Sequence, residues 1–314
     1  MIVTVTVNPS LDRTVDLDGP LLVGAVQSAA GTRDDAGGKG VNVARVVAAS
    51  GVETLAVLPL AGDDPYAEVL ARTGLPIRRV GLTGHARVNL TLAAPDGITT
   101  KINLPGVTRT AQDGERLIDE IVAAARGARW LVLAGSVPPG LGDDFYARVI
   151  SAVRAAGDAP RIAVDTSGPA LAAVVAGARP DLIKPNEDEL AELVGVALDA
   201  DADLVSVVHD LARQLVPQAV GAALVTLGAA GAVLVTADGA WHAIPPPTRV
   251  RSTVGAGDSS LAGYLLADVS GADPAERVRR GIRYGSAAAS LPGTQAPTPA
   301  DLPTGDVPVR SLTH

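Results

Sequence analysis

The chain has 314 residues, a formal net charge of −8 and no cysteine. This length allows one large α/β domain or two smaller ones. The lack of cysteine excludes disulfides, thiolate metal sites and a cysteine nucleophile, and the absence of a basic face with interleaved aromatic residues argues against nucleic-acid binding.

The chain opens with a short β-branched segment over Ile2–Val7, which is typical of a buried strand and carries no export signal. No apolar run reaches the ~18 residues of a membrane-spanning helix, so we expect a soluble, cytoplasmic protein. Helices and strands then alternate in the order helix 39–49, strand 54–60, helix 111–126, strand 130–134, helix 144–156, strand 161–165, helix 169–177, strand 181–186, helix 203–216 and strand 222–228. This alternation predicts an α/β fold with a mainly parallel sheet and helices on both faces.

Two segments, 12–32 and 86–104, break the alternation. The second contains two alternating runs joined by Pro95-Asp96-Gly97, which is a hairpin signal. We expect both segments to form a small β-sheet, a lid, standing off a main domain made of 1–11, 33–85 and 105–300. The Pro-rich tail 301–314 is predicted to be loosely held.

Candidate polar residues fall where predicted strands end, which is where ligands bind in open parallel sheets. They are Asn8, Asp12, Gly135, Ser136, Asp165 and Asn186.

The sharpest local signal is a glycine-rich corner, Gly255-Ala256-Gly257, followed by Asp258 and an apolar helical run. The amides of Ala256, Gly257 and Asp258 at a helix N-terminus would bind an anion such as a transferring phosphate. The Asp258 carboxylate could accept a proton from an attacking hydroxyl, as a weak base weakened further by the helix dipole. The alternative is that Asp258 is a helix N-cap.

A second glycine cluster, Gly37, Gly38 and Gly40, brings backbone close to a ligand beside Lys39 and Asn42. It is not a Walker A loop, because Arg33 stands where that loop needs glycine and Gly40 where it needs serine or threonine. The alternative is a tight turn that caps a helix.

The segment KPNEDEL places Lys184, Asn186, Glu187 and Glu189 around a helix start. An amide oxygen at Asn186 and a carboxylate at Glu189 suit Mg²⁺ bound through water, although the same pair resembles a capping box and both roles can coexist.

Thr226, Gly228 and Gly231 lie at a strand–turn–strand corner, where glycines serve either the hairpin or the close approach of a nucleotide phosphate. We interpret His85 and His242 as surface or loop residues, and the four scattered histidines as no metal site. The arginines of the last long helix are interpreted as a solvated face: Arg277, Arg279, Arg280 and Arg283.

In this order and spacing, GGKGVNVA, AGSVPPG, KPNEDEL, VTLGAAGA and STVGAGDS resemble the PfkB family of ribokinase-like sugar kinases. The opening TVTVNPSLD resembles the branch that phosphorylates hexose phosphates: 1-phosphofructokinases, tagatose-6-phosphate kinases and minor 6-phosphofructokinases. The resemblance extends to about residue 294. It implies a Rossmann-like sheet flanked by helices, with a β-lid that often forms a dimer interface.

The resemblance also implies roles for individual residues. Asp258 would be the catalytic base, and Gly255, Ala256 and Gly257 the anion hole. The sugar site would be lined by Asp12, Gly38, Lys39, Asn42 and Ser136. Arg87 and Asn89 would approach the substrate phosphate, and Lys101 and Asn103 on the partner strand are weaker candidates. ATP would be held by Lys184, Asn186, Thr226, Gly228 and Gly231, and Mg²⁺ by Asn186 and Glu189. Some members bind a monovalent cation such as K⁺ through carbonyls near positions matching Ser252, Val254, Ala288, Leu291 and Gly293.

The predicted function is therefore ATP-dependent phosphorylation of a hexose phosphate, with a preference for fructose 1-phosphate over fructose 6-phosphate and tagatose 6-phosphate. Three alternatives stay open at this point: a kinase of an unphosphorylated sugar or nucleoside, a sugar-phosphate sensor on a kinase scaffold, and a nicotinamide dehydrogenase. The last is weak because no Gly-x-Gly-x-x-Gly turn follows the first strand.

Overall fold

A computed structural model describes residues 1–199 and 201–312. Its main feature is a ten-stranded sheet with the order β14-β13-β12-β11-β10-β9-β8-β1-β4-β5. The strands from β11 to β5 pair in parallel, whereas β12, β13 and β14 are added antiparallel at one edge. The bounds are β1 Ile2–Val5, β4 Thr54–Pro59, β5 Ile77–Val80, β8 Trp130–Ala134, β9 Arg161–Asp165, β10 Leu182–Ile183, β11 Ala222–Thr226, β12 Ala232–Thr236, β13 Gly239–Ala243 and β14 Val309–Ser311.

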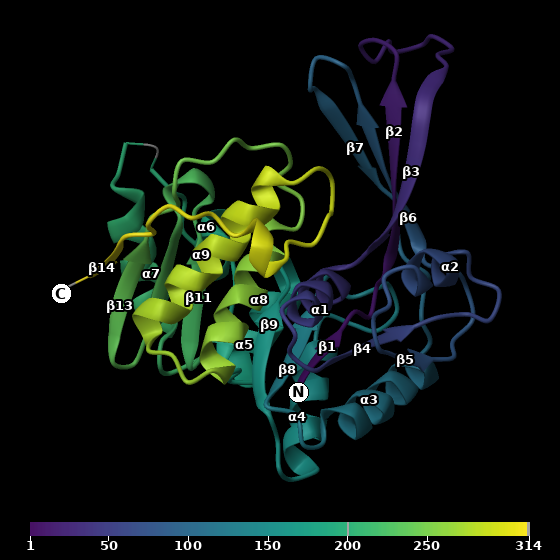
Figure 1. Ribbon diagram of the computed structural model, residues 1–314. Helices are drawn as coiled ribbons and strands as arrows, with labels where there is room; N and C mark the ends of the chain where they lie inside the picture. The colour runs from purple at the N-terminus through teal and green to yellow at the C-terminus, as the bar shows by residue number, and fades with distance from the viewer. Residues whose placement is uncertain (200, 313–314) are drawn as a thin grey trace.

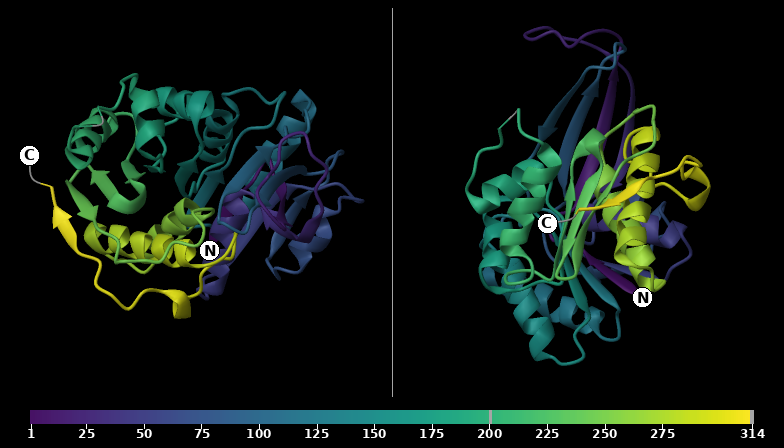
Figure 2. Two further views of the ribbon diagram at one scale, coloured as in Figure 1. Left: turned by 90° about the horizontal axis from the view of Figure 1, so that it is seen from above. Right: turned by 90° about the vertical axis from the view of Figure 1, so that its left-hand side faces the viewer.

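Helices cover both faces of this sheet (Figure 2). Because strand side chains alternate between faces, Val3 and Leu131 pack on one side while Ile2 and Trp130 pack on the other. The first face is covered by α3 Ala111–Ala125, α4 Phe145–Ala155, α5 Gly168–Gly177, α6 Glu187–Val194 and α7 Leu204–Leu215. The second is covered by α1 Lys39–Ala49, α8 Ala256–Val269 and α9 Pro274–Ser290. The short helix α2, Tyr66–Ala71, packs near β4 in a third cluster. The predicted α/β class is thereby confirmed.

A second sheet stands off the body (Figure 1). Its order is β3-β2-β6-β7, with bounds β2 Ser10–Leu17, β3 Ala29–Gly37, β6 Arg87–Ala93 and β7 Thr99–Asn103. The hairpin between β6 and β7 turns at Gly97, whose amide bonds Ala94 O at 3.0 Å. We call this sheet the lid; β2 and β3 extend beyond the predicted range 12–32, because both strands continue into the body.

The C-terminal tail differs from its prediction. Val309–Ser311 pair with β13 as an edge strand, and Val307 is fully buried. Backbone pairing and an apolar anchor therefore hold the segment up to residue 312, while the rest of the predicted tail, 313–314, lies outside the described residues. Within the described part of the chain, no helix combines the length and the apolar character needed to cross a bilayer.

Candidate active site

Helix α8 begins at the predicted corner. Gly255 is the N-cap with φ of +76°, a conformation that favours glycine, so Asp258 occupies the third helical position. The Asp258 side chain does not cap the helix, because Oδ2 instead accepts a hydrogen bond of 2.8 Å from Asn42 Nδ2 of α1. The N-cap alternative is therefore wrong. The first amides of a helix lack intrahelical acceptors, so those of Gly257 and Asp258 are available to an anion. The third predicted amide, that of Ala256, instead donates to the Thr253 carbonyl oxygen at 3.4 Å.

The Asp258 carboxyl is only 6 % exposed. Burial, together with the negative charge of Asp165, raises its pKa to about 6, although Lys39 and the Asn42 bond oppose the rise. The expectation of a base weakened by the helix dipole is therefore wrong, because burial and the Asp165 charge raise the pKa. A carboxylate with this pKa is ionised at neutral pH and is a better proton acceptor than an ordinary one.

Asp165, at the end of β9, joins two lysines beneath this corner. Its Oδ1 lies 2.7 Å from Lys39 Nζ and its Oδ2 lies 3.2 Å from Lys184 Nζ. Burial would raise the pKa of Asp165, but the two ammonium groups outweigh burial and hold it below the usual range. Asp165 likewise raises the pKa of Lys39, so this lysine stays charged. Two fixed positive charges therefore lie beside the helix start.

Lys184 is placed next to the anion-binding corner itself. A Cβ added at Gly257 would lie 3.2 Å from Lys184 Nζ. A side chain at position 257 would crowd this ammonium group, so glycine lets Lys184 share the space above the Gly257 and Asp258 amides. This arrangement can neutralise an anion held there.

On the lid, four residues of neighbouring strands form one row: Asp35, Asp12, Asn89 and Asn103. Asp12 Oδ1 accepts bonds from Ser10 Oγ at 2.7 Å and from Asn89 Nδ2 at 3.0 Å. Burial raises the pKa of Asp12. The next row towards the lid tip, on the same face, is Arg33, Thr14, Thr91 and Lys101.

These rows form one wall of a cavity of about 520 Å³. The opposite wall is made by two segments of the body, 251–254 and 292–294.

Arg87 lies one row nearer the body, opposite Ser10. Its Nε is buried and unpartnered among the described residues, and burial lowers its pKa although Asp12 is near. Asn8 Nδ2 donates to Ser136 Oγ at 3.0 Å, which joins the ends of β1 and β8.

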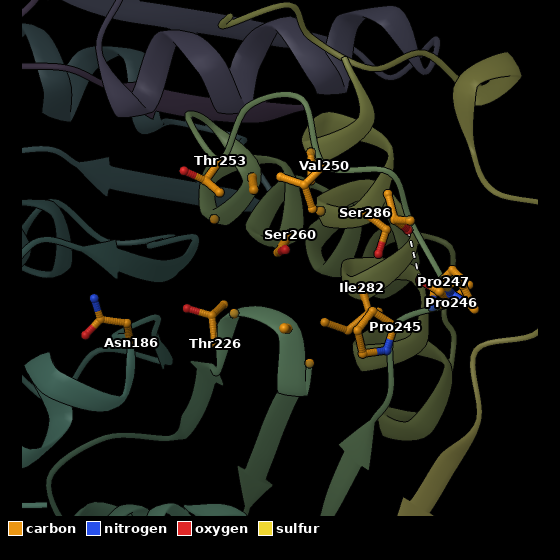
Figure 3. A pocket seen from close by; sticks show the side chains of 18 of the residues that line it. Asn186, Thr226, Pro245, Pro246, Pro247, Val250, Thr253, Ser260, Ile282 and Ser286 are labelled. Carbon is orange, nitrogen blue, oxygen red and sulfur yellow. Dashed lines mark hydrogen bonds between the residues drawn. The ribbon is translucent and has the colours of Figure 1, made fainter. Parts of the chain in front are cut away.

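A second cavity of about 700 Å³ lies on the other side of the α8 start. Figure 3 shows Asn186 and Thr226 facing Thr253 and Ser260 across it. Gly228, Gly231, Ala256 and Gly257 also line this cavity, together with apolar side chains of 245–250 and α9. Thr253 lines both cavities, so they meet beside the Gly255–Asp258 corner.

The capping box at α6 is present. Asn186 Oδ1 accepts from the Glu189 amide at 2.7 Å, and Glu189 Oε2 accepts from the Asn186 amide at 2.9 Å. No cluster of three or more acidic or histidine side chains that could hold a metal occurs in the described residues. The second oxygen of Glu189 is not used by the box, so a metal held through water fits this donor set better than direct chelation.

The histidines and the arginines of α9, interpreted from the sequence as surface residues, differ in their surroundings. The side chain of His85 is half exposed, near Asp63, and His242 bonds Ala230 O at 2.7 Å. The prediction that the α9 arginines form a solvated face is wrong for Arg277 and Arg279. Arg277 pairs with buried Asp268, and Arg279 donates to Glu276 and to the Val307 carbonyl oxygen.

Comparison with known proteins settles the family. Residues 6–301 match the pfkB family carbohydrate kinases. This chain is a pfkB-family carbohydrate kinase. It is 38 % identical over 309 residues to a 1-phosphofructokinase of Rhodobacter capsulatus, covering 96 % of this chain and 94 % of that protein. It is 32 % identical to the ATP-dependent 6-phosphofructokinase isozyme 2 of Escherichia coli, covering 94 % of each chain.

A crystal structure of phosphofructokinase-2 from Escherichia coli in complex with substrates and products matches with a TM-score of 0.86 and 31 % identity over 96 % of each chain. The pfkB kinase is thus a phosphotransferase with an alcohol acceptor, of the branch that the motifs predicted. The dehydrogenase alternative is excluded.

For this kinase, the structure divides the predicted site residues among three places. Lys39, Asn42 and Lys184 lie at the Asp258 corner. The lid cavity is lined by Asp12, Asn89 and Asn103, and the apolar cavity by Asn186, Thr226, Gly228 and Gly231. Arg87 and Ser136 line neither cavity. Ser252, Val254 and Gly293 of the predicted cation group share the lid cavity, whereas Ala288 and Leu291 lie at the end of α9. Asp165 pairs with both lysines, a role that its place after a predicted strand does not by itself indicate. The sequence feature that could have indicated this role is an aspartate at the end of a predicted strand, between the motifs that carry Lys39 and Lys184.

Proposed function

We propose that this kinase transfers the γ-phosphoryl group of ATP to the free primary hydroxyl of fructose 1-phosphate. The observation that carries the proposal is the position of Asp258. It is a buried carboxylate at a helix start with free amides. The preceding residues Ala256 and Gly257 line the apolar cavity, and this cavity meets the polar lid cavity at Thr253. The apolar cavity would hold ATP and the lid cavity the sugar.

Each group at the junction has a role in the proposed transfer. The sugar oxygen forms a bond to the γ-phosphorus, the bond to the bridging oxygen of ADP breaks, and the hydroxyl proton passes to Asp258. The Gly257 and Asp258 amides and Lys184 would stabilise the negative charge on the moving phosphoryl group. Asn42 orients the Asp258 carboxylate through its 2.8 Å bond. Thr226, Gly228 and Gly231 would border the ATP phosphates.

Magnesium would be held through water by Asn186 and Glu189, and it would neutralise phosphate charge when bound. A monovalent cation such as K⁺ near the carbonyls of Ser252, Val254 and Gly293 belongs to the same proposal; one related crystal structure is described as a complex with potassium.

The lid residues support a phosphorylated acceptor. Asp12 and Asn89 supply acceptors and donors for sugar hydroxyls, and Arg87 has a buried Nε without a partner. A buried N–H without a partner costs stability unless an acceptor completes it, and Arg87 as a whole is only half-buried, so its guanidinium group can meet a ligand. The phosphate of the substrate is the anion we propose for Arg87.

The test is a comparison of kcat/KM with Mg-ATP for fructose 1-phosphate, fructose 6-phosphate, tagatose 6-phosphate and unphosphorylated fructose. We expect fructose 1-phosphate to lead and fructose to be the poorest. Arg87→Ala should raise KM for the sugar phosphate at least tenfold and KM for ATP little. Equal effects on both KM values, or a preference for fructose, would contradict the phosphate site. No turnover of any sugar would favour the sensor alternative.

The lid also presents apolar surface to a partner. Of the ten large apolar side chains that are exposed in the described residues, seven belong to the lid and its loops: Leu21, Leu22, Val23, Val26, Ile98, Ile102 and Leu104. A second copy of this chain, lid against lid, is the partner we propose. Sedimentation should give a dimer, and Val23→Asp with Val26→Asp should give monomers.

A further inference from the structure

The segment Pro292–Thr294, which follows α9 and which we call the 292–294 loop, is held between the lid and α1. It lines the lid cavity opposite the lid rows described above. Two arginines, Arg33 and Arg45, touch it.

Arg33 of β3 reaches this loop from the lid. A Cβ added at Gly293 would overlap Nη2 of Arg33 and lie 3.3 Å from its Cζ, so the guanidinium group packs on the Gly293 backbone. Gly293 has φ of +60°, and a glycine there satisfies both the turn and the close approach. Arg33 Nε also lies 2.8 Å from Asp35 Oδ2, which fixes the direction of the side chain.

Arg45 holds the same loop from the body. Its Nη1 donates to the Thr294 carbonyl oxygen at 3.1 Å. Arg45 belongs to α1, the helix that also carries Asn42, the partner of Asp258. The 292–294 loop therefore touches a lid strand through one arginine and the active-site helix through another.

The end of α9 is in turn tied to the segment that enters the anion-binding corner. The amides of Arg251 and Ser252 donate to the Ala289 carbonyl oxygen at 2.8 and 3.3 Å. Ser252 Oγ then accepts from the Val254 amide at 3.2 Å, immediately before Gly255. The lid contact at Gly293 is therefore connected to the anion-binding corner through the chain from 293 back to Ala289 and the hydrogen bonds from Ala289 to the 251–254 segment.

We propose that Arg33 is a positioning residue that couples the lid to the anion-binding corner through the 292–294 loop. The inference rests on the proposed function, in which the lid cavity takes the sugar phosphate. With the lid on the sugar, Arg33 holds the 292–294 loop and so fixes 251–254 and the Gly255–Asp258 corner. With the lid away, that restraint is lost and the corner binds the γ-phosphate less well. Sugar binding therefore strengthens ATP binding, and reciprocally.

The measurement is the Kd of a non-hydrolysable ATP analogue with Mg²⁺, by calorimetry, with and without saturating fructose 1-phosphate. The wild type should bind the analogue roughly 5–150-fold more tightly when the sugar is present, the usual range for coupled sites. In Arg33→Ala this gain should fall close to one, and kcat should fall about tenfold through lost orientation. The Kd of the analogue without sugar should stay unchanged.

Two further variants keep the proposal falsifiable. Gly293→Ala displaces Arg33 from the loop, so its effect on the coupling and that of Arg33→Ala should not add in the double variant. The matched control is Arg13→Ala, because Arg13 pairs with Asp34 at 2.7 Å on the same lid but on the opposite face. It should leave the coupling and kcat as in the wild type.

Sugar-phosphate turnover by the wild type is measured first. A wild type without turnover would contradict the proposed function, whereas an active wild type keeps the two questions separate. With an active wild type, the coupling role is overturned if Arg33→Ala still binds the ATP analogue more tightly when sugar is present. This holds whether the variant behaves like Arg13→Ala or only has a raised KM for the sugar. It is also overturned if the effects of Arg33→Ala and Gly293→Ala simply add.

Discussion

Helix α8 carries a buried aspartate near each end, and the surroundings of the two differ sharply. Asp268, 1 % exposed, accepts a bond of 2.8 Å from Trp130 Nε1 and pairs with Arg277 at 3.0 Å and with Arg161. Asp258, 6 % exposed, has a single side-chain hydrogen bond, from Asn42, and no ion pair within the described residues.

The difference indicates that Asp268 has a structural role and Asp258 a chemical one, although both lie on the same helix. A buried carboxylate is tolerated when neighbouring donors and charges compensate for lost water, as at Asp268. At Asp258 the compensation is incomplete, so burial raises the pKa to about 6. Groups left this way beside a cavity are candidates for reaction. The same residue type therefore anchors the helix at one end and can accept a proton at the other.

The largest effect should come from Asp258→Asn. The amide keeps the size of the side chain and an oxygen for the Asn42 donor, but it cannot take the hydroxyl proton. We expect kcat to fall on the order of 10²–10⁴, the usual contribution of a general base. The measurement is sugar-phosphate phosphorylation by a coupled ADP assay. Turnover near that of the wild type would remove Asp258 from the mechanism.

The opposite outcome is expected at the other end of the helix. Asp268→Ala leaves Arg161 and Arg277 without their shared carboxylate. Removing one partner of a fully buried pair costs about 3–5 kcal/mol, but both guanidinium groups are partly exposed, so we expect about 2–3 kcal/mol of lost stability. Urea unfolding measures this loss. Below the unfolding transition kcat should stay close to that of the wild type; a loss as large as that of Asp258→Asn would contradict the contrast.

The pH dependence sharpens the role of Asp258. Below its pKa of about 6 the carboxyl is protonated and cannot act as a base, so kcat/KM should fall about tenfold per pH unit there. A sugar phosphate also titrates near pH 6. The wild type should therefore approach a slope of two on a logarithmic plot, and Asp258→Asn a slope of one. Identical slopes would mean that only the substrate titrates.

Part of this contrast is readable from the sequence. Helix α1 begins and ends as predicted at 39–49, and α8 begins at the glycine corner, because glycine patterns and apolar periodicity are local signals. The place of Asp258 at the third helical position, rather than the cap, is not readable, since it depends on the φ of Gly255.

Contacts between distant segments explain what the sequence does not show. Asp165 and Lys39 are 126 positions apart in the sequence. They meet because α1, which begins at Lys39, packs on β1 and β8, and β9 lies next to β8. Arg33 meets Gly293 because the lid and the 292–294 loop line the same cavity. Arg277 looks solvated in sequence, but the packing of α9 on α8 brings it to Asp268. The pattern of charges along the sequence does not reveal these pairings, because they depend on how the strands, helices and lid pack in space.

The smallest predicted effect concerns stability, and its sign follows from the pKa shift. The folded pKa of Asp258, about 6, lies above its ordinary value of 3.8, so ionising this carboxyl is harder in the folded state than in the unfolded one. The wild type is therefore penalised above pH 6, and the penalty disappears as pH falls below about 4, where both states are protonated. Asp258→Asn carries no such penalty. Its Tm should exceed that of the wild type by a few degrees at pH 7, and the two should converge by pH 4. Thermal unfolding followed by circular dichroism at pH 4, 5, 6 and 7 measures the difference. A Tm below the wild type at pH 7 would show that the Asp258 carboxylate stabilises the fold, as Asp268 does.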